Sequence, residues 1–144
     1  MIKELYMFKT VGFGTYRLRG DIAYSSTLAA LKEGYRHIDT ANLYKNEEEV
    51  GRAIQDSGIL REELWITTKI QVQDIKKGFD HMYKSVINSL NKLNVEYIDL
   101  ILLHGPVEER LKESWSELES IMVKLEGKIR HIGISNYDID QIKE

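Results

Sequence analysis

The stretch IDLILLH at Ile98–His104 decides the class of fold. Apart from its second and last residues the run is apolar, so it does not alternate between apolar and polar positions. A strand of this composition is expected to be covered on both faces, as is typical of strands in parallel sheets. The run ends on a polar side chain, His104. It therefore predicts a buried parallel strand that presents a polar group at its carboxyl end.

Four other short apolar runs flank this stretch, and amphipathic segments separate them. The runs are VGFGT at Val11–Thr15, HID at His37–Asp39, LWITTK at Leu64–Lys69 and RHIGIS at Arg130–Ser135. Between Lys76 and Leu93 apolar residues recur at spacings of three and four, as on one face of an α-helix, and Ile22–Leu31 and Trp115–Leu125 carry similar stripes. The order predicts an α/β chain of about five strand-helix units. Periodicity alone does not separate a barrel from a doubly wound open sheet.

Helix boundaries are also marked in the sequence. Asn46 precedes the acidic residues 47–49 and is a predicted N-cap, with acids where the helix dipole favours them. Gly34, Gly58 and Gly127 lie where the predicted helices should end.

Composition indicates an ordinary globular protein, and we interpret residues 1–144 as a single domain. The formal net charge is −3, with 20 Lys and Arg scattered among 23 Asp and Glu, so no basic face predicts nucleic-acid binding. Cysteine is absent, which excludes disulfides and thiolate chemistry. No apolar run approaches the roughly 20 residues of a membrane span, so we expect a cytoplasmic protein without a membrane partner.

Each predicted strand ends on polar residues, and these carry the functional prediction. They are Thr15, Asp39, Lys69, His104, and Ser135 with Asn136. In a barrel the carboxyl ends of the strands converge on one rim, where active sites lie. Taken singly each residue has an ordinary explanation: a turn cap, a solvated strand end, or a hydrogen-bonded turn histidine. The joint pattern favours a site.

With these residues in view, the sequence resembles the aldo-keto reductases. The resemblance rests on five motifs that follow the family's order and cover nearly the whole chain: GFGTY at Gly12–Tyr16, GYRHIDTANLYKNEEEVG at Gly34–Gly51, ITTK at Ile66–Lys69, YIDLILLHGP at Tyr97–Pro106 and GKIRHIGISN at Gly127–Asn136. The second motif is the most specific. The resemblance implies a (β/α)8 TIM barrel with a short N-terminal β-hairpin, here at Glu4–Thr10, and NADPH-dependent reduction of an aldehyde or ketone.

The resemblance also assigns catalytic roles. Hydride addition to a carbonyl leaves an alkoxide that needs a proton, and a tyrosine with its ordinary pKa near ~10 is a poor donor at neutral pH unless an ammonium favours its phenolate. Tyr44 is the implied general acid, Lys69 the ammonium, and Asp39 the partner that holds Lys69. His104 would orient the carbonyl and donate a hydrogen bond to its oxygen.

Cofactor contacts are implied in the same way. Ser135 and Asn136 match the positions that hold the nicotinamide carboxamide, and Gly14, Thr15 and Tyr16 match the loop beside cofactor and substrate. Asp39 is the remaining residue expected at the cofactor. The resemblance implies no metal, and a small carbonyl compound is the expected substrate.

Two departures from the family pattern qualify these expectations. Gly105 follows the histidine where many family members have tryptophan, so an aromatic wall of the substrate pocket is expected to be missing. The sequence ends at Glu144, whereas a full barrel needs roughly 250 residues. The chain is thus expected to be truncated after the fifth strand, without the residues that would hold the adenosine 2′-phosphate, and to bind NADPH weakly.

Two other interpretations remain open at this stage. A catalytically inactive remnant or binding subunit could keep all four residues. An unrelated doubly wound protein would show the same alternation, but no GxGxxG follows an early strand. A partial barrel also leaves its edge strands unpaired, and the sequence predicts self-association through those edges.

Overall fold

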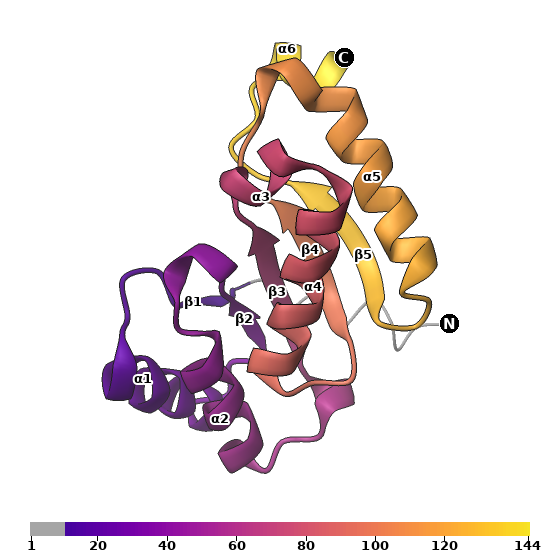
Figure 1. Cartoon of the computed structure of the whole chain (residues 1–144). Coiled ribbons are helices and arrows are strands. Elements are labelled where there is room, and N and C mark those ends of the chain that lie inside the picture. The colour runs from indigo at the N-terminus through magenta and orange to yellow at the C-terminus, as the bar shows by residue number, and fades with distance from the viewer. Residues whose placement is uncertain (1–10) are drawn as a thin grey trace.

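The computed structural model describes residues 11–144, and the predicted hairpin at Glu4–Thr10 lies outside this range. Within residues 11–144, five parallel strands form one sheet in the order in which they occur in the chain (Figure 1). The strands are β1 Phe13–Gly14, β2 His37–Asp39, β3 Trp65–Ile70, β4 Ile98–Leu103 and β5 Ile129–Ile134. All five predicted strands are therefore present and parallel.

Helices connect successive strands, as expected for parallel neighbours, which cannot be joined by a hairpin. The α-helices are α1 Gly20–Lys32, α2 Glu47–Ser57, α3 Val72–Lys77, α4 Phe79–Leu93, α5 Leu111–Lys124 and α6 Ile139–Lys143. The described residues also form three short 3-10 turns, η2 Asn42–Tyr44, η3 Arg61–Glu63 and η4 Glu108–Arg110. None of the helices within residues 11–144 is both long and apolar enough to cross a membrane.

The helical pattern predicted over Lys76–Leu93 corresponds to α4, which begins three residues later, at Phe79, and ends at Leu93. Gly78 separates α3 from α4 and has a φ of 87°, which lies outside the helical region. Lys76 and Lys77, the first two residues of the predicted range, are instead the last two residues of α3. Gly58 ends α2 in the left-handed conformation, as predicted.

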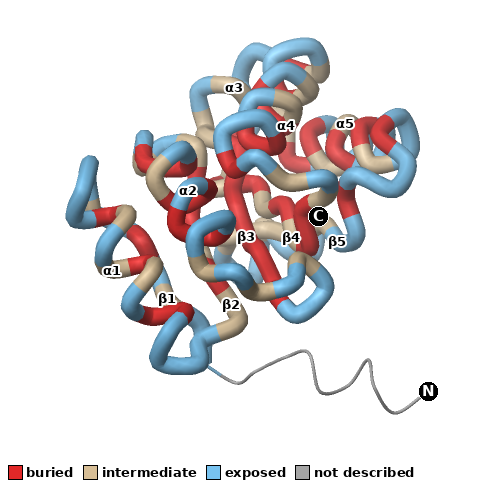
Figure 2. The backbone as a smooth tube through the Cα atoms, turned by 90° about the horizontal axis from the view of Figure 1, so that it is seen from below, coloured by how far each residue is buried: buried red, intermediate tan, exposed pale blue. Residues whose placement is uncertain are grey.

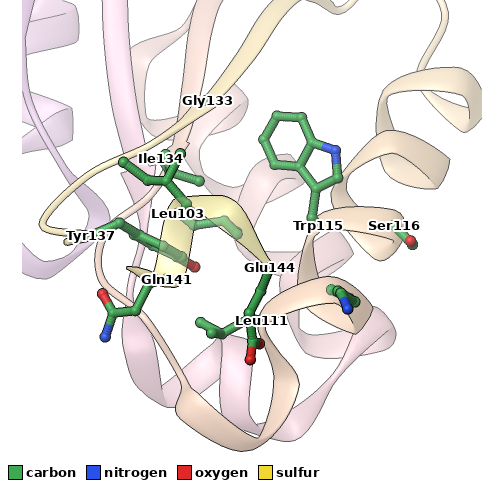
Figure 3. Close-up of a pocket in the computed structure, with 11 residues that line it drawn as sticks. Leu103, Leu111, Trp115, Ser116, Gly133, Ile134, Tyr137, Gln141 and Glu144 are labelled. Carbon is green, nitrogen blue, oxygen red and sulfur yellow. The ribbon is translucent and has the colours of Figure 1, made fainter. Parts of the chain in front are cut away.

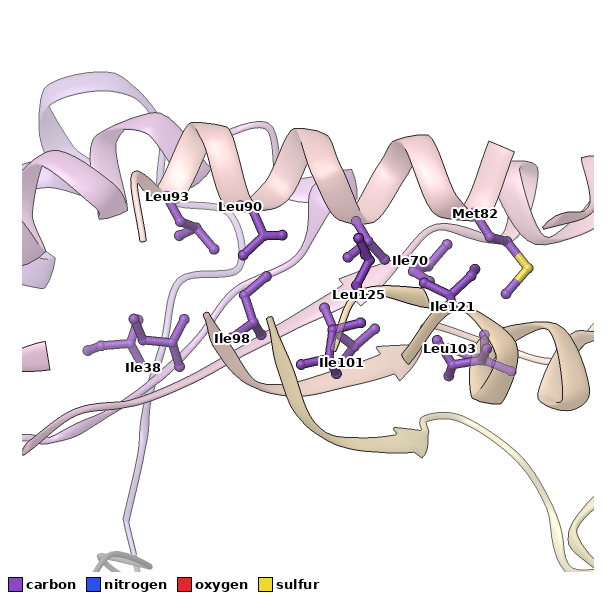
Figure 4. Close-up of a cluster of buried hydrophobic side chains, with 14 of the residues drawn as sticks. Ile38, Ile70, Met82, Leu90, Leu93, Ile98, Ile101, Leu103, Ile121 and Leu125 are labelled. Atoms are coloured by element: carbon purple, nitrogen blue, oxygen red, sulfur yellow. The ribbon is translucent and has the colours of Figure 1, made fainter. Parts of the chain in front are cut away.

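The core lies between the sheet and the helices that cover its outer face. In Figure 4, Met82, Leu90 and Leu93 of α4 point toward the strands, where Ile101 and Leu103 of β4 meet them. Figure 2 shows the same division, with β3 buried and the outer surfaces of the helices exposed. Every residue of β3 is buried, whereas β5 is mostly exposed or half-buried. The sheet is thus most deeply buried at its central strand, β3, and more exposed to solvent along β5.

Helices α2 and α4 approach closely at Gly51. A Cβ atom at this position would lie 2.6 Å from the Leu93 carbonyl oxygen and 2.7 Å from that of Lys92. Backbone atoms of α4 therefore occupy the space that any larger side chain would need, and glycine allows the two helices to pack at this distance.

A charged cluster closes the amino end of the central strands. Asp99, fully buried, accepts hydrogen bonds from the Ile66 amide at 2.9 Å and the Arg61 guanidinium at 2.5 Å, and Arg130 lies 3.4 Å away. The ring of Tyr97 contacts both guanidinium groups, whose central carbons lie 3.9 Å and 3.7 Å from its centroid. Because these contacts join β3, β4 and β5, the cluster fixes the pairing of the three strands.

Candidate active site

The carboxyl ends of the strands bring the predicted catalytic residues together. Asp39 is the last residue of β2, Lys69 lies near the end of β3, and His104 directly follows β4. Asp39 pairs with Thr67, so Lys69, two residues further along β3 and on the same face, reaches past the end of β2. Tyr44 ends the short turn η2 that follows β2.

The Lys69 ammonium is the centre of this arrangement. Its Nζ atom donates hydrogen bonds to Asp39 Oδ1 at 2.5 Å, to the Thr40 carbonyl at 2.9 Å and to the Tyr44 hydroxyl at 3.5 Å. An ammonium has three protons to donate, and all three have an oxygen partner. Only 7% of the Lys69 side chain is exposed, so these partners replace most of its hydration.

The Tyr44 hydroxyl accepts a hydrogen bond from Lys69 and keeps its own proton available for donation. Because Lys69 donates to the phenol oxygen, the Tyr44 proton must point elsewhere, and the hydroxyl donates no hydrogen bond to another of residues 11–144. Tyr16 packs on the Tyr44 ring with centroids 5.1 Å apart. His104 meets the same ring edge-on at 5.6 Å. Two aromatic contacts and one ammonium therefore hold the phenol at the rim.

His104 combines a neutral imidazole with an unused polar atom. Burial and then the Lys69 charge lower the pKa of His104 below its ordinary value, and nearby Asp39 opposes them. Its Nδ1 atom is buried and has no hydrogen-bond partner among the described residues. A neutral imidazole carries one N–H donor and can therefore bind a carbonyl oxygen without adding charge to the site.

Ser135 and Asn136 follow β5 at the same rim. The Asn136 amide nitrogen donates to the His104 carbonyl at 2.7 Å and to the Ser135 hydroxyl at 3.2 Å. These bonds leave the Asn136 amide oxygen and the Ser135 hydroxyl proton for another partner. An acceptor beside a donor complements a carboxamide, so this pair fits the nicotinamide end of the predicted cofactor.

The residues predicted to form the loop after β1 differ in burial and in their contacts. Thr15 is fully buried, and its amide and hydroxyl both donate to the Asp39 carbonyl, at 2.9 Å and 3.3 Å. Thr15 thus holds β1 to β2. Gly14 has open space where a Cβ would lie, and Tyr16 is exposed beside Tyr44.

Gly105 is buried, and Val72 of α3 borders it. A Cβ at Gly105 would lie 3.3 Å from Val72 Cγ2, tighter than most contacts of this kind. Any larger residue here would press against the start of α3.

A separate cavity of about 510 Å³ lies outside β5 between α5 and α6, lined by Trp115, Ile134 and Tyr137 among others (Figure 3). None of the four predicted catalytic residues lines it.

The hydrogen bonds of Asn46 were not predicted from the sequence, where its position indicated only a helix cap. It directly precedes α2, but its side chain makes no capping hydrogen bond. Instead Asn46 is fully buried and bonds to Thr40, Thr15 and Leu18. The next residue, Glu47, is also buried and accepts a hydrogen bond from Thr68 at 2.7 Å, and burial raises the pKa of its carboxyl.

A parallel strand-helix sheet with a Lys-centred group of Asp, Tyr and His at one rim defines the class of protein, and comparison with known proteins agrees. Residues 10–144 match the model of the Aldo/keto reductase family. The chain therefore belongs to the aldo/keto reductase family.

Individual relatives support the same assignment. The chain is 42% identical to the glyoxal reductase of Bacillus subtilis and 46% identical to the methylglyoxal reductase DkgB of Yersinia pestis, covering 92% of this chain in both matches. A solved aldo-keto reductase from a deep-sea metagenome library matches with a TM-score of 0.84 and 41% identity. The chain spans about half the length of these relatives, 47% to 49%. The sheet is thus the predicted partial (β/α)8 barrel.

Proposed function

We propose that this chain carries the catalytic residues of an NADPH-dependent reductase that converts small aldehydes or ketones to alcohols. The observation that supports this most directly is the Lys69 ammonium, which is bonded to Asp39 and to the Tyr44 hydroxyl at once. The names of relatives suggest the substrate class, because glyoxal and methylglyoxal are small dicarbonyl compounds.

In this proposal the residues act on the carbonyl oxygen. When bound, the nicotinamide cofactor supplies a hydride, and Ser135 and Asn136 would hold its carboxamide. His104 donates a hydrogen bond to the carbonyl oxygen and fixes its position. Tyr44 gives its proton to the same oxygen as negative charge develops there, and the Lys69 ammonium stabilises the phenolate that remains. Asp39 keeps Lys69 in place.

The test needs a complete barrel, because the chain matches only half of its relatives. Residues 10–144 can be fused to the carboxyl-terminal half of the Bacillus subtilis glyoxal reductase at the corresponding position. We expect the fusion to reduce methylglyoxal with NADPH. Tyr44→Phe should lower kcat at least ~100-fold, since general acid catalysis typically contributes that much. Lys69→Met should be similarly severe.

Tyr24→Phe is the matched control. It removes a hydroxyl that hydrogen-bonds to Asp56 on the surface between α1 and α2, away from the rim. We expect normal turnover in this variant. Near-normal turnover in Tyr44→Phe would show that another group donates the proton and would refute the proposed mechanism. A folded fusion without any activity would instead favour a non-catalytic role for the chain.

A further inference from the structure

Asn46 joins three segments that meet at the rim. Its Oδ1 atom accepts a hydrogen bond from the Thr40 hydroxyl at 3.0 Å, and its Nδ2 atom donates to the carbonyls of Thr15 at 2.8 Å and Leu18 at 2.9 Å. The residue is completely buried. Each Asn46 bond therefore replaces a bond to water, and losing one would leave a buried polar group unpaired.

These bonds close a ring of contacts around the proposed proton donor. Thr40 is bonded to Asn46 through its hydroxyl and to Lys69 through its carbonyl, at 3.0 Å and 2.9 Å. Asn46 is joined to Tyr44 by the backbone through Lys45, which adopts the left-handed conformation with a φ of 54°. The contact between Lys69 Nζ and the Tyr44 hydroxyl, 3.5 Å long, closes the ring.

The other two bonds connect the ring to the loop after β1. Thr15 and Leu18 flank Tyr16, whose ring packs on Tyr44. By holding both flanking carbonyls, Asn46 fixes the backbone on each side of this aromatic contact. Two bonds of the side chain that precedes α2 therefore hold the loop that carries Tyr16, whereas the helix start receives no bond from this side chain.

We propose that Asn46 is a positioning residue that sets the distance between the Tyr44 hydroxyl and the Lys69 ammonium. The inference rests on the proposed function, in which that contact serves proton transfer. Asn46 touches neither the substrate nor the cofactor in this scheme. It acts through Thr40 on one side and through the backbone to Tyr44 on the other.

A spectroscopic test on the 144-residue chain measures this contact without catalysis. Tyrosines labelled with 13C at Cζ report their surroundings by NMR, and the Tyr44 signal is identified by its loss in Tyr44→Phe. Lys69→Met removes the ammonium and should move the Tyr44 signal. In Asn46→Ala we expect the signal to move most of the way to its Lys69→Met position. Adding Lys69→Met to Asn46→Ala should then have little effect, as expected for two coupled residues.

Asp99→Asn is the control for general loss of stability. It weakens the buried cluster at the opposite end of the strands and should leave the Tyr44 signal unmoved. If Asn46→Ala does not fold, as judged by circular dichroism, Thr40→Val interrupts the same ring by removing one hydroxyl and should move the signal in the same way.

Two results would overturn the proposal: an unmoved Tyr44 signal in folded Asn46→Ala, or, where that variant does not fold, an unmoved signal in Thr40→Val. Neither outcome depends on reductase activity. Loss of the proposed function would be recognised separately, by normal turnover in Tyr44→Phe.

Discussion

Replacing Gly51 with alanine tests the close approach of α2 to α4. Alanine would normally stabilise a helix interior relative to glycine by about 0.5–1 kcal/mol. Here the added methyl group would lie 2.6 Å from the Leu93 carbonyl oxygen and 2.7 Å from its carbonyl carbon. Both atoms belong to the backbone of α4, so no side-chain rotation relieves the overlap and one helix must move.

The expected net effect of Gly51→Ala is destabilisation. Inserting a methyl group into a packed interior typically costs about 1–3 kcal/mol, occasionally more, and this exceeds the gain in helix propensity. Urea denaturation followed by circular dichroism measures the free energy of unfolding. Gly14→Ala is a control without steric conflict, since its Cβ would meet nothing within 4 Å. A Gly51→Ala chain as stable as the parent would refute the packing argument.

Two further predictions concern pH and assembly. Burial raises the pKa of Glu47 above its ordinary value, so the folded state holds the proton of this carboxyl more tightly than the unfolded state does. The contribution of Glu47 to stability is therefore lost as the pH rises through its raised pKa in the folded state. Glu47→Gln keeps an oxygen that can accept the hydrogen bond of the Thr68 hydroxyl. In thermal melts this variant should therefore be as stable as the parent in acid and more stable than the parent near neutral pH. The same difference in melting temperature between variant and parent at both pH values would contradict this prediction. Strand β5 has a strand partner on only one side among residues 11–144, and Ile132 and Ile134 are half-buried. We propose that the chain alone associates through this edge; sedimentation as a monomer with a cooperative melt would argue against it.

Much of the fold could be predicted because apolar runs and polar strand ends are local signals. The run Ile98–His104 indicated a buried parallel strand, and β4 covers all of it except the final histidine. Asp39, Lys69 and His104 could be assigned to one rim because parallel strands end on the same side. Tyr44 required the family resemblance, since nothing in a loop position reveals which way a side chain points.

The remaining features depend on distances that the sequence does not encode locally. Asn46 has the residue type and place of a helix cap, and only the tertiary structure shows that Thr15, Leu18 and Thr40 take its hydrogen bonds instead. Gly78 lies within the predicted helical range, and the break there follows from its backbone, whose φ of 87° lies outside the helical region. For Asn46, neighbours in space that are far apart along the chain decide the outcome.

The order of strands in the sheet bears on how the site can form during synthesis. Each strand pairs with the one made just before it, so the sheet can grow one strand at a time as the chain leaves the ribosome. Asp39, Tyr44 and Lys69 are all present once β3 has emerged, and their contacts need no later segment. The ion pair at the rim can therefore form early and help to hold β2 against β3 while the later strands are still being made.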